Sequence, residues 1–309
     1  DPFRYKLGGR LLNNQMEEFT QNYGVVEEGK YVVTRDVGSY AIMKEVDAGR
    51  GSPHGGVYLS FQHCSEAALR AAFGPVIDRL AANNIDLTKM PVEVAPIAHY
   101  HMGGIAADVH MQTELPGLFA AGEVVGGANG ANRLSGNAIT EALVFGRRAG
   151  RSAAQFANRM RAQPAELDTA HPSLDLVLAT ATKRDFNAAE AMQTLQTTMQ
   201  NDVGALRNAA GLIRALETVD RLTGDLGDAP FGDGGRFDMQ RVDWFDLRNM
   251  LLVARAVVEA ALSRRETRGA HQRDDHPHTA PEWAVNQYVR LRDGRVVLSG
   301  APAAAAVAS

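Results

Sequence analysis

The stretch that most constrains this chain is residues 115–150, which read LPGLFAAGEVVGGANGANRLSGNAITEALVFGRRAG. An apolar run of the buried-strand type leads into a loop of glycine, asparagine and serine, and a helix is predicted over residues 137–160. Strand, glycine loop and helix in this order are typical of an α/β nucleotide-binding fold, which binds ligands beyond the carboxyl ends of its strands.

Two charged residues stand out in this loop. Glu123 follows the predicted strand, where a carboxylate can accept hydrogen bonds from ribose hydroxyls. Arg133 precedes the helix and can bind a carboxylate with two parallel hydrogen bonds, while the helix start offers free N–H groups and the positive end of its dipole. The spacing is equally compatible with a structural ion pair between Glu123 and Arg133. Glycines let the backbone approach a flat ligand closely, and the loop has four, at 126, 127, 130 and 136.

The rest of the chain divides into a mixed part and a helical part. Residues 30–34 and 56–61 have strand composition, residues 65–84 predict a helix capped by Ser65, and residues 92–109 are strand-like with an interruption at two glycines. Two helical runs follow, the first through Met199, Val203, Leu206, Ala210, Ile213 and Leu216, the second through Leu247, Met250, Leu251, Ala254, Val257, Val258 and Ala261.

Composition excludes several classes of function. With 45% hydrophobic residues, 22% charged residues and a net charge of −4, the chain is a globular protein with no basic surplus for binding nucleic acid. Its one cysteine excludes an internal disulfide and suggests a reducing compartment. His99 and His101 alternate on a strand-like segment, but no acidic or cysteine partner is nearby, so satisfied polar histidines are the more common explanation than a metal site.

An ordered set of motifs resembles the flavoprotein subunits of succinate dehydrogenase and fumarate reductase, with aspartate oxidase as a relative. The motifs are HYHMGGI, PGLFAAGE, NGANRLSGNAI and VFGRRAG, flanked by GGRLLNNQMEEFTQNY, TRDVGSYAIMKEVDAGRG, TMQNDVGALR and ETRGAHQRDDHP. Each motif alone would be weak, but together they span nearly the whole chain in the family's order.

The resemblance implies an α/β plus α fold: an incomplete FAD-binding Rossmann-like domain, an α+β capping domain and a C-terminal helical domain. Residues 1–92 match part of the capping domain, 93–160 the C-terminal part of the FAD-binding domain, 161–285 the helical domain and 286–309 a tail. The family's N-terminal G-x-G-x-x-G unit is not in this sequence. With Asp1 as its first residue, the chain is expected to be a fragment, a processed chain or one half of a split protein that needs the N-terminal FAD-binding half.

The resemblance also assigns roles to individual residues. His99 and Arg133 match substrate-carboxylate ligands, and the cofactor FAD would be contacted by Tyr100, Glu123, Asn137, Ala138 and Ile139. The family's proton donor is an arginine ahead of a double glycine, where this chain reads FRYKLGG. The proton-transfer candidates are therefore Arg4, Tyr5 and Lys6. Further departures are Asn129 in place of the usual histidine, Ser135 in place of glycine and Ala138 in place of serine.

Two functions from different classes follow from this resemblance. The first is an FAD-dependent oxidoreductase that transfers hydride between flavin N5 and a carboxylate or dicarboxylate such as succinate or fumarate. The second is a non-catalytic or split scaffold subunit of a multisubunit redox complex, which the altered FRYKLGG segment favours. In either case the expected partner is an iron–sulfur subunit. The protein would bind no nucleic acid and lie in the cytoplasm, free or peripheral on the inner face of the membrane.

Overall fold

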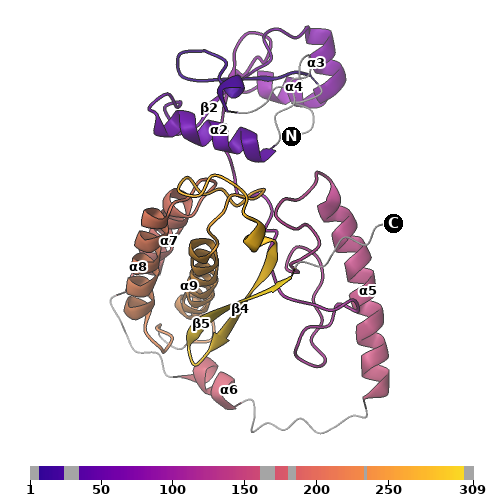
Figure 1. Cartoon of the computed structure of the whole chain (residues 1–309), viewed down its shortest axis with the longest axis vertical. Helices are drawn as coiled ribbons and strands as arrows, with labels where there is room; N and C mark the ends of the chain where they lie inside the picture. The colour runs from indigo at the N-terminus through magenta and orange to yellow at the C-terminus, as the bar shows by residue number, and fades with distance from the viewer. Residues whose placement is uncertain (1–6, 24–34, 161–170, 180–185, 233–234, 303–309) are drawn as a thin grey trace. The chain divides into compact units, whose positions relative to one another are not determined.

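The computed structural model describes residues 7–23, 35–160, 171–179, 186–232 and 235–302 (Figure 1). The chain divides into two compact units. The first unit holds residues 1–105 and 121–145, and the second holds residues 106–120 and 146–309. The domain boundaries expected at residues 92, 160 and 285 do not coincide with this division. They rest on the family's domain order rather than on compactness, and stay predictions.

A small antiparallel sheet organises the first unit. Its strands are β1 (Arg10–Leu12), β2 (Val57–Ser60) and β3 (Val92–Val94), in the order β1-β2-β3. The strand predicted over residues 56–61 is therefore confirmed as β2, whereas the one predicted over residues 30–34 lies outside the described residues. Helix α2 (Arg35–Asp47) covers the sheet, and the core between them consists of Leu11, Phe19, Ala41, Ile42 and Val57.

A buried carboxylate ties α2 to the turn η1 (Thr20–Asn22). Glu45 is 1% exposed and accepts hydrogen bonds from Arg50 Nε and Nη2, both at 2.8 Å, and from the Tyr23 hydroxyl at 2.6 Å. The hydrogen bonds from Arg50 lower the pKa of Glu45 to about 2 despite the opposing effect of burial. A carboxylate with this many donors stays charged at neutral pH, so the network is satisfied rather than strained.

The segment predicted as one helix over residues 65–84 forms two. Helix α3 (Glu66–Phe73) begins as expected, with the Ser65 hydroxyl accepting from the N–H of Ala68 at 3.2 Å. Gly74 then adopts a φ of 51°, and Pro75 opens helix α4 (Pro75–Ala81). The prediction of one helix was wrong because a left-handed glycine followed by proline ends one helix and starts the next.

Helix α5 (Asn137–Arg159) confirms the helix predicted after the glycine loop. The residues before it form fewer strands than expected. Among the described residues of 95–127, strand character is limited to isolated bridges, such as the parallel bridge between Ile105 and Val125. A strand needs continuous neighbours on at least one side, and these short bridges provide only local pairing.

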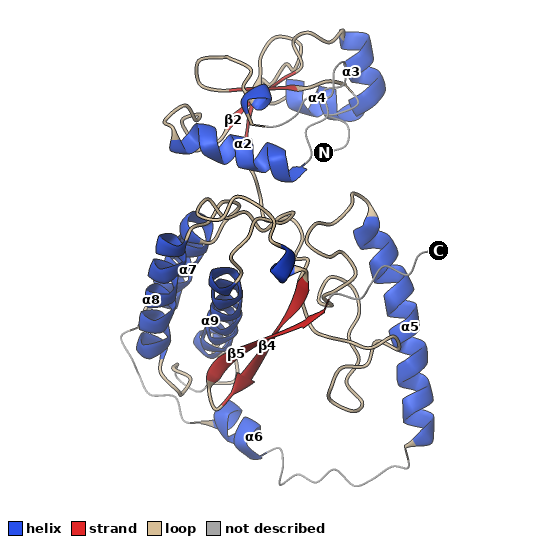
Figure 2. Ribbon diagram, viewed as in Figure 1, coloured by secondary structure: helices blue, strands red, loops and turns tan. Residues whose placement is uncertain are grey.

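Three helices form the core of the second unit: α7 (Ala188–Asp202), α8 (Ala209–Leu226) and α9 (Met239–Ser263), which pack against one another (Figure 2). Helix α6 (His171–Leu178) precedes them. Each of the three begins at a polar cap, namely Asn187, Asn208 and Asp238. The continuous periodicity predicted through residues 199–216 is interrupted because α7 ends at Asp202 and the Asn208 side chain caps a new helix.

The segment expected as a C-terminal tail from residue 286 is folded as far as Pro302. Strands β4 (Val285–Arg292) and β5 (Arg295–Pro302) pair along their whole length and contact α9. The turn η3 (Pro281–Trp283) leads into them. The alternation of apolar and polar residues in VNQYVRLR is typical of a strand in a hairpin. Asp293 and Gly294 form the turn between the two strands, and both have left-handed conformations. Residues 303–309 lie outside the described part.

Between α9 and the hairpin lies a dense network of charges. The carboxylate of Glu266 is 0% exposed and accepts from Arg264 Nη1 at 2.6 Å, from Arg268 Nε at 2.7 Å and Nη2 at 2.9 Å, and from the N–H of Ala280 at 2.9 Å. The pKa of Glu266 is lowered, because these donors outweigh the effect of burial, which raises it. The network therefore holds a charged carboxylate at the base of the hairpin.

Candidate functional site

Two backbone segments cross closely at the head of the glycine loop. The N–H of Ile105 donates to Val124 O at 2.7 Å, and the N–H of Gly126 donates to Ile105 O at 3.2 Å. A Cβ on Gly104 would lie 2.3 Å from Val124 O, and a Cβ on Gly126 would lie 2.8 Å from Gly104 N. Only glycine fits at these two positions, and the crossing brings the HYHMGGI and GEVVGG segments together.

Glu123 is held by this crossing. Its Oε1 accepts the backbone N–H of His101 at 2.9 Å, while the residue as a whole is exposed. Among the described residues its carboxylate makes no ion pair with Arg133, so the structural ion pair that the sequence left open is not formed. The hydrogen bond from His101 therefore fixes the Glu123 carboxylate in place, while the residue stays exposed to solvent.

A compact polar cluster lies behind the loop. The Tyr100 hydroxyl donates to Glu141 Oε2 at 2.6 Å, and the Asn129 amide donates to the same oxygen at 2.8 Å and reaches the Tyr100 oxygen at 3.4 Å. Glu141 is 6% exposed and lies one turn into α5. The hydrogen bond to Glu141, assisted by burial, raises the pKa of Tyr100, so the phenol is protonated at neutral pH.

Arg133 lies on the face of Tyr100. The guanidinium carbon is 4.3 Å from the centre of the ring, within the range of a cation–π interaction. No carboxylate among the described residues lies within ion-pair distance of Arg133, which is half-buried. The aromatic ring therefore supports the guanidinium without neutralising its charge, which leaves the charge available to an anionic ligand.

The other predicted site residues are placed as follows. His99 is exposed, and its side chain makes no hydrogen bond to another described residue. Asn137, Ala138 and Ile139 form the first turn of α5, with Ile139 72% exposed. The proton-transfer candidates lie outside the described residues, and these are Arg4, Tyr5 and Lys6.

Sequence reasoning missed two members of the cluster. Glu141 received no role, although a carboxylate inside the apolar run AITEALVF is unusual enough to mark it. Asn129 was noted only as a departure from the family's histidine. The structure shows it donating to Glu141, a contact across 12 residues that neither periodicity nor spacing indicates.

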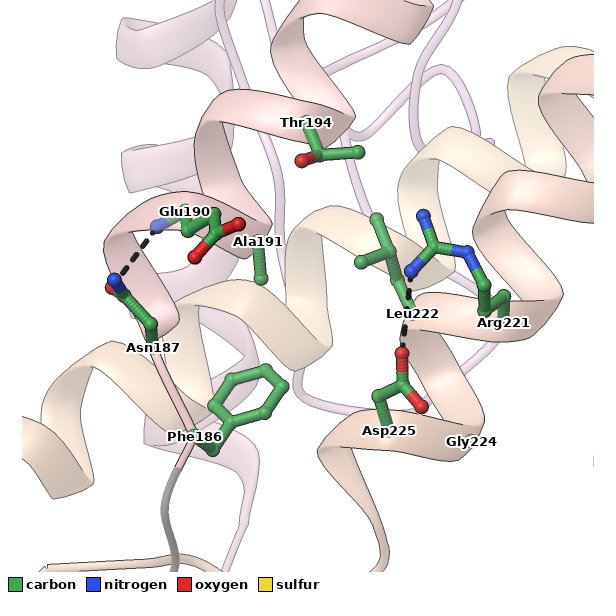
Figure 3. Close-up of a pocket in the computed structure, with 9 residues that line it drawn as sticks. All are labelled: Phe186, Asn187, Glu190, Ala191, Thr194, Arg221, Leu222, Gly224 and Asp225. Carbon is green, nitrogen blue, oxygen red and sulfur yellow. Dashed lines mark hydrogen bonds and ion pairs between the residues drawn. The ribbon is translucent and has the colours of Figure 1, made fainter.

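The second unit, which does not contain this cluster, has a cavity of about 430 Å³ lined by residues of α7 and α8 and by Phe186 and Asn187 ahead of α7 (Figure 3). Phe186 and Leu222 contribute apolar surface, and Arg221 pairs with Asp225 at 3.3 Å beside it. None of the sequence motifs that carry chemistry contributes a side chain to this cavity. Over the described parts of the chain, no three His, Cys, Asp or Glu side chains come together as metal ligands.

Comparison with known proteins gives the family. Residues 3–139 match the FAD binding domain, and residues 192–301 match the fumarate reductase flavoprotein C-terminal domain. The L-aspartate oxidase of Rhodospirillum rubrum is 36% identical over 249 residues, which are 80% of this chain and 79% of that protein. The chain belongs to the fumarate reductase and aspartate oxidase family of FAD-dependent oxidoreductases.

Other relatives of this flavoprotein are longer. One subunit of the fumarate reductase (CoM/CoB) of Methanothermobacter marburgensis is 38% identical over 89% of this chain, which spans only 50% of that protein. FrdA of Escherichia coli quinol fumarate reductase superimposes with a TM-score of 0.85 at 26% identity, over 99% of this chain and 56% of that one. This chain therefore spans about half the length of these two relatives. The fold expected from its motifs is confirmed.

The start of α5 fits the flat cofactor of this family. A Cβ on Gly127, Gly130 or Gly136 would meet no atom within 4 Å, so the loop backbone is open to a ligand. Leu134 and Ile139, beside it, are 74% and 72% exposed and offer apolar surface to a ring system. Glycine backbone, apolar side chains and a helix N-terminus together suit an isoalloxazine ring that carries partial negative charge.

The long helices α5 and α9 both carry several charged residues along their length. No helix among the described residues combines the length and the apolar character needed to cross a lipid bilayer.

Proposed function

We propose that this flavoprotein supplies the substrate-binding side of an oxidoreductase that reduces or oxidises a small carboxylate or dicarboxylate of the succinate and fumarate type. The observation that carries the proposal is Arg133, a half-buried guanidinium supported on the Tyr100 ring with no carboxylate partner among the described residues. A guanidinium in this state binds a carboxylate with two charge-assisted hydrogen bonds.

In this proposal each side chain has one task. Arg133 holds one substrate carboxylate and His99, exposed ahead of the same crossing, binds another. Glu123, held by the N–H of His101, accepts hydrogen bonds from the ribose hydroxyls of FAD. The first turn of α5 faces the isoalloxazine ring of FAD through Asn137, Ala138 and Ile139. When bound, FAD supplies the hydride acceptor or donor at its N5 position.

A proton must accompany the hydride when a C=C bond is reduced. The candidates that carry it are Arg4, Tyr5 and Lys6, from the segment that takes the place of the family's arginine. Tyrosine and lysine have ordinary pKa values of about 10, so either can donate a proton when a neighbouring group assists its transfer.

The proposed partners follow from the part of the family's length that this chain matches. The first is the N-terminal FAD-binding half, either in the same parent chain or as a separate polypeptide. The second is an iron–sulfur subunit. The Methanothermobacter relative is one subunit of its enzyme, which supports a partner subunit, and the iron–sulfur character follows from the family resemblance alone. We place the assembled enzyme in the cytoplasm, free or peripheral on the inner face of the membrane.

The test is a reconstitution with the N-terminal half and FAD, followed by fumarate-dependent reoxidation of the reduced flavin. Arg133→Ala should lower kcat/KM by about 10²-fold or more, because a bidentate charge-assisted interaction is lost. The matched control is Arg147→Ala, an exposed arginine on α5. Full activity in Arg133→Ala would refute the role of Arg133 in binding the substrate. A reconstituted assembly that binds no flavin would support the alternative of a non-catalytic scaffold subunit.

A further inference from the structure

We propose that Glu141 is a positioning residue that acts on the substrate through Tyr100 and Arg133, so that a buried carboxylate sets the orientation of the half-buried guanidinium. The inference rests on the proposed function, because it concerns how Arg133 is held in place for a carboxylate substrate. It adds to that function two residues that lie behind Tyr100, namely Glu141 and Asn129. Neither the sequence motifs nor the comparisons supply a role for them.

The first step is the burial of Glu141. Glu141 is 6% exposed, and among the described residues only Oε2 of its two oxygens has partners, namely the Tyr100 hydroxyl and the Asn129 amide. Within the described part of the chain, Oε1 is buried without a hydrogen-bond partner. Burying a carboxylate with one oxygen unsatisfied is unfavourable for stability, so its presence here points to a task other than holding the fold together.

The second step is the effect of Glu141 on Tyr100. A phenol that donates a 2.6 Å hydrogen bond to a carboxylate gains electron density from it, and the aromatic ring shares that density. The attraction between a cation and an aromatic face grows with the negative potential of that face. The hydrogen bond therefore both fixes the ring plane and strengthens its hold on the guanidinium 4.3 Å above it.

The third step is the effect of the ring on Arg133. Arginine has a long side chain with several freely rotating bonds. Arg133 lies in a loop of small residues, and no ion pair with another described residue restrains its guanidinium. The Tyr100 face selects a set of positions for the guanidinium before any substrate arrives. A substrate carboxylate then meets an ordered partner, which improves its affinity without a new contact.

Asn129 completes the chain of contacts. Its amide donates to Glu141 Oε2 at 2.8 Å and approaches the Tyr100 oxygen at 3.4 Å, so it fixes the carboxylate on the side that faces the phenol. An amide donates at every pH at which the protein is folded, whereas an imidazole in the same place would change its charge near neutrality.

The experiment uses the FAD-loaded, fully assembled enzyme and measures the Kd of malonate, a non-reacting dicarboxylate, from the change in flavin absorbance. Glu141→Gln and Tyr100→Phe should each raise the malonate Kd about fivefold to tenfold, and Tyr100→Leu, which removes the ring, should raise it further. The KM for fumarate should rise in parallel with kcat changed less. The control is Glu217→Gln on the exposed face of α8, which should leave the malonate Kd unchanged.

A double-mutant cycle separates this inference from the proposed function. In an Arg133→Ala background, Glu141→Gln should have no further effect on the malonate Kd, because the group it positions is gone. If Arg133→Ala alone leaves the malonate Kd unchanged, the proposed function has failed. If Arg133→Ala weakens binding but Glu141→Gln and Tyr100→Phe do not, only the positioning role is refuted. Equal weakening by Glu141→Gln with and without Arg133 also refutes it, since the carboxylate would then act independently of the arginine.

Discussion

Replacing Glu266 with glutamine should destabilise the helical unit far more than an ordinary surface substitution. The carboxylate is fully buried and receives four hydrogen bonds, three from the guanidinium groups of Arg264 and Arg268 and one from the N–H of Ala280. A glutamine keeps one acceptor oxygen but turns an amide donor toward groups that are themselves donors. Both arginines then lose their charge partner.

The size of the effect follows from the exposure of the two arginines. Removing one partner of a buried ion pair costs about 3–5 kcal/mol. The Arg268 side chain is 36% exposed and can rehydrate, whereas Arg264 is 14% exposed and keeps the carbonyls of Trp283 and Val285 as acceptors. Both facts reduce the penalty, so we expect the lower end of the range, about 3 kcal/mol.

The assay is urea unfolding followed by tryptophan fluorescence. The chain has two tryptophans, Trp244 and Trp283, and both lie in the second unit. Trp244 is 1% exposed in the helical core, and Trp283 stacks under the guanidinium of Arg264, 5.2 Å away. The signal therefore reports on this unit. With a slope of about 2–3 kcal/mol per molar urea, the midpoint should fall by about 1–1.5 M.

The matched control is Glu259→Gln on α9, where the carboxylate forms an i,i+4 pair with Arg255 at 3.3 Å and remains partly exposed. Its midpoint should move by no more than about 0.3 M, because such pairs contribute little. A Glu266→Gln midpoint equal to that of this control would refute the reasoning, since the buried network would then contribute no more than a surface pair.

Two further predictions concern the same unit. Burial, together with the positive charge of Arg207, lowers the pKa of His271 from 6.5 to about 4, so the unfolded chain binds a proton on this residue before the folded one does. The contribution of His271 to the free energy of unfolding should thus be complete above pH 6.5 and decline toward pH 4, by up to about 1.4 kcal/mol per pH unit. His271→Gln should flatten that decline in urea titrations at stepped pH, and an unchanged slope would contradict the assignment. Leu247→Ala, at a position 0% exposed in the core of α7, α8 and α9, should cost about 2–5 kcal/mol in the same titration, whereas a loss below about 1 kcal/mol would mean that the core refills the space.

The sequence predicted the bounds of α5 closely, and its periodic run from Leu247 to Ala261 lies within α9, although α9 begins eight residues earlier, at Met239. It predicted the start of α3 at Ser65 because a cap is a local signal. The break at Gly74 was missed because apolar spacing continues across it. The candidate site shows the same limit, as motifs identified Arg133 and Glu123 while the partners of Tyr100 depend on contacts across 29 and 41 residues.

The strand expected before Gly126 is not formed among the described residues, because too few neighbouring backbone segments pair with it. Composition marks residues 118–125 as apolar, but the segment finds only isolated bridges to Gln112 and Ile105. An apolar run forms a strand only where neighbouring backbones complete its hydrogen bonds, and local sequence carries no information about those neighbours.

The close crossing at Gly104 and Gly126 has a consequence for how this site can vary. Neither glycine has a side chain to offer a ligand, yet an alanine at Gly104 would place a carbon 2.3 Å from Val124 O. A saturation library screened for folded protein should therefore lose nearly every variant at these two codons, whereas Ile105, which is 43% exposed, should accept many. Any route to a new substrate in this family member must thus pass through the side chains around the crossing and leave its two glycines untouched.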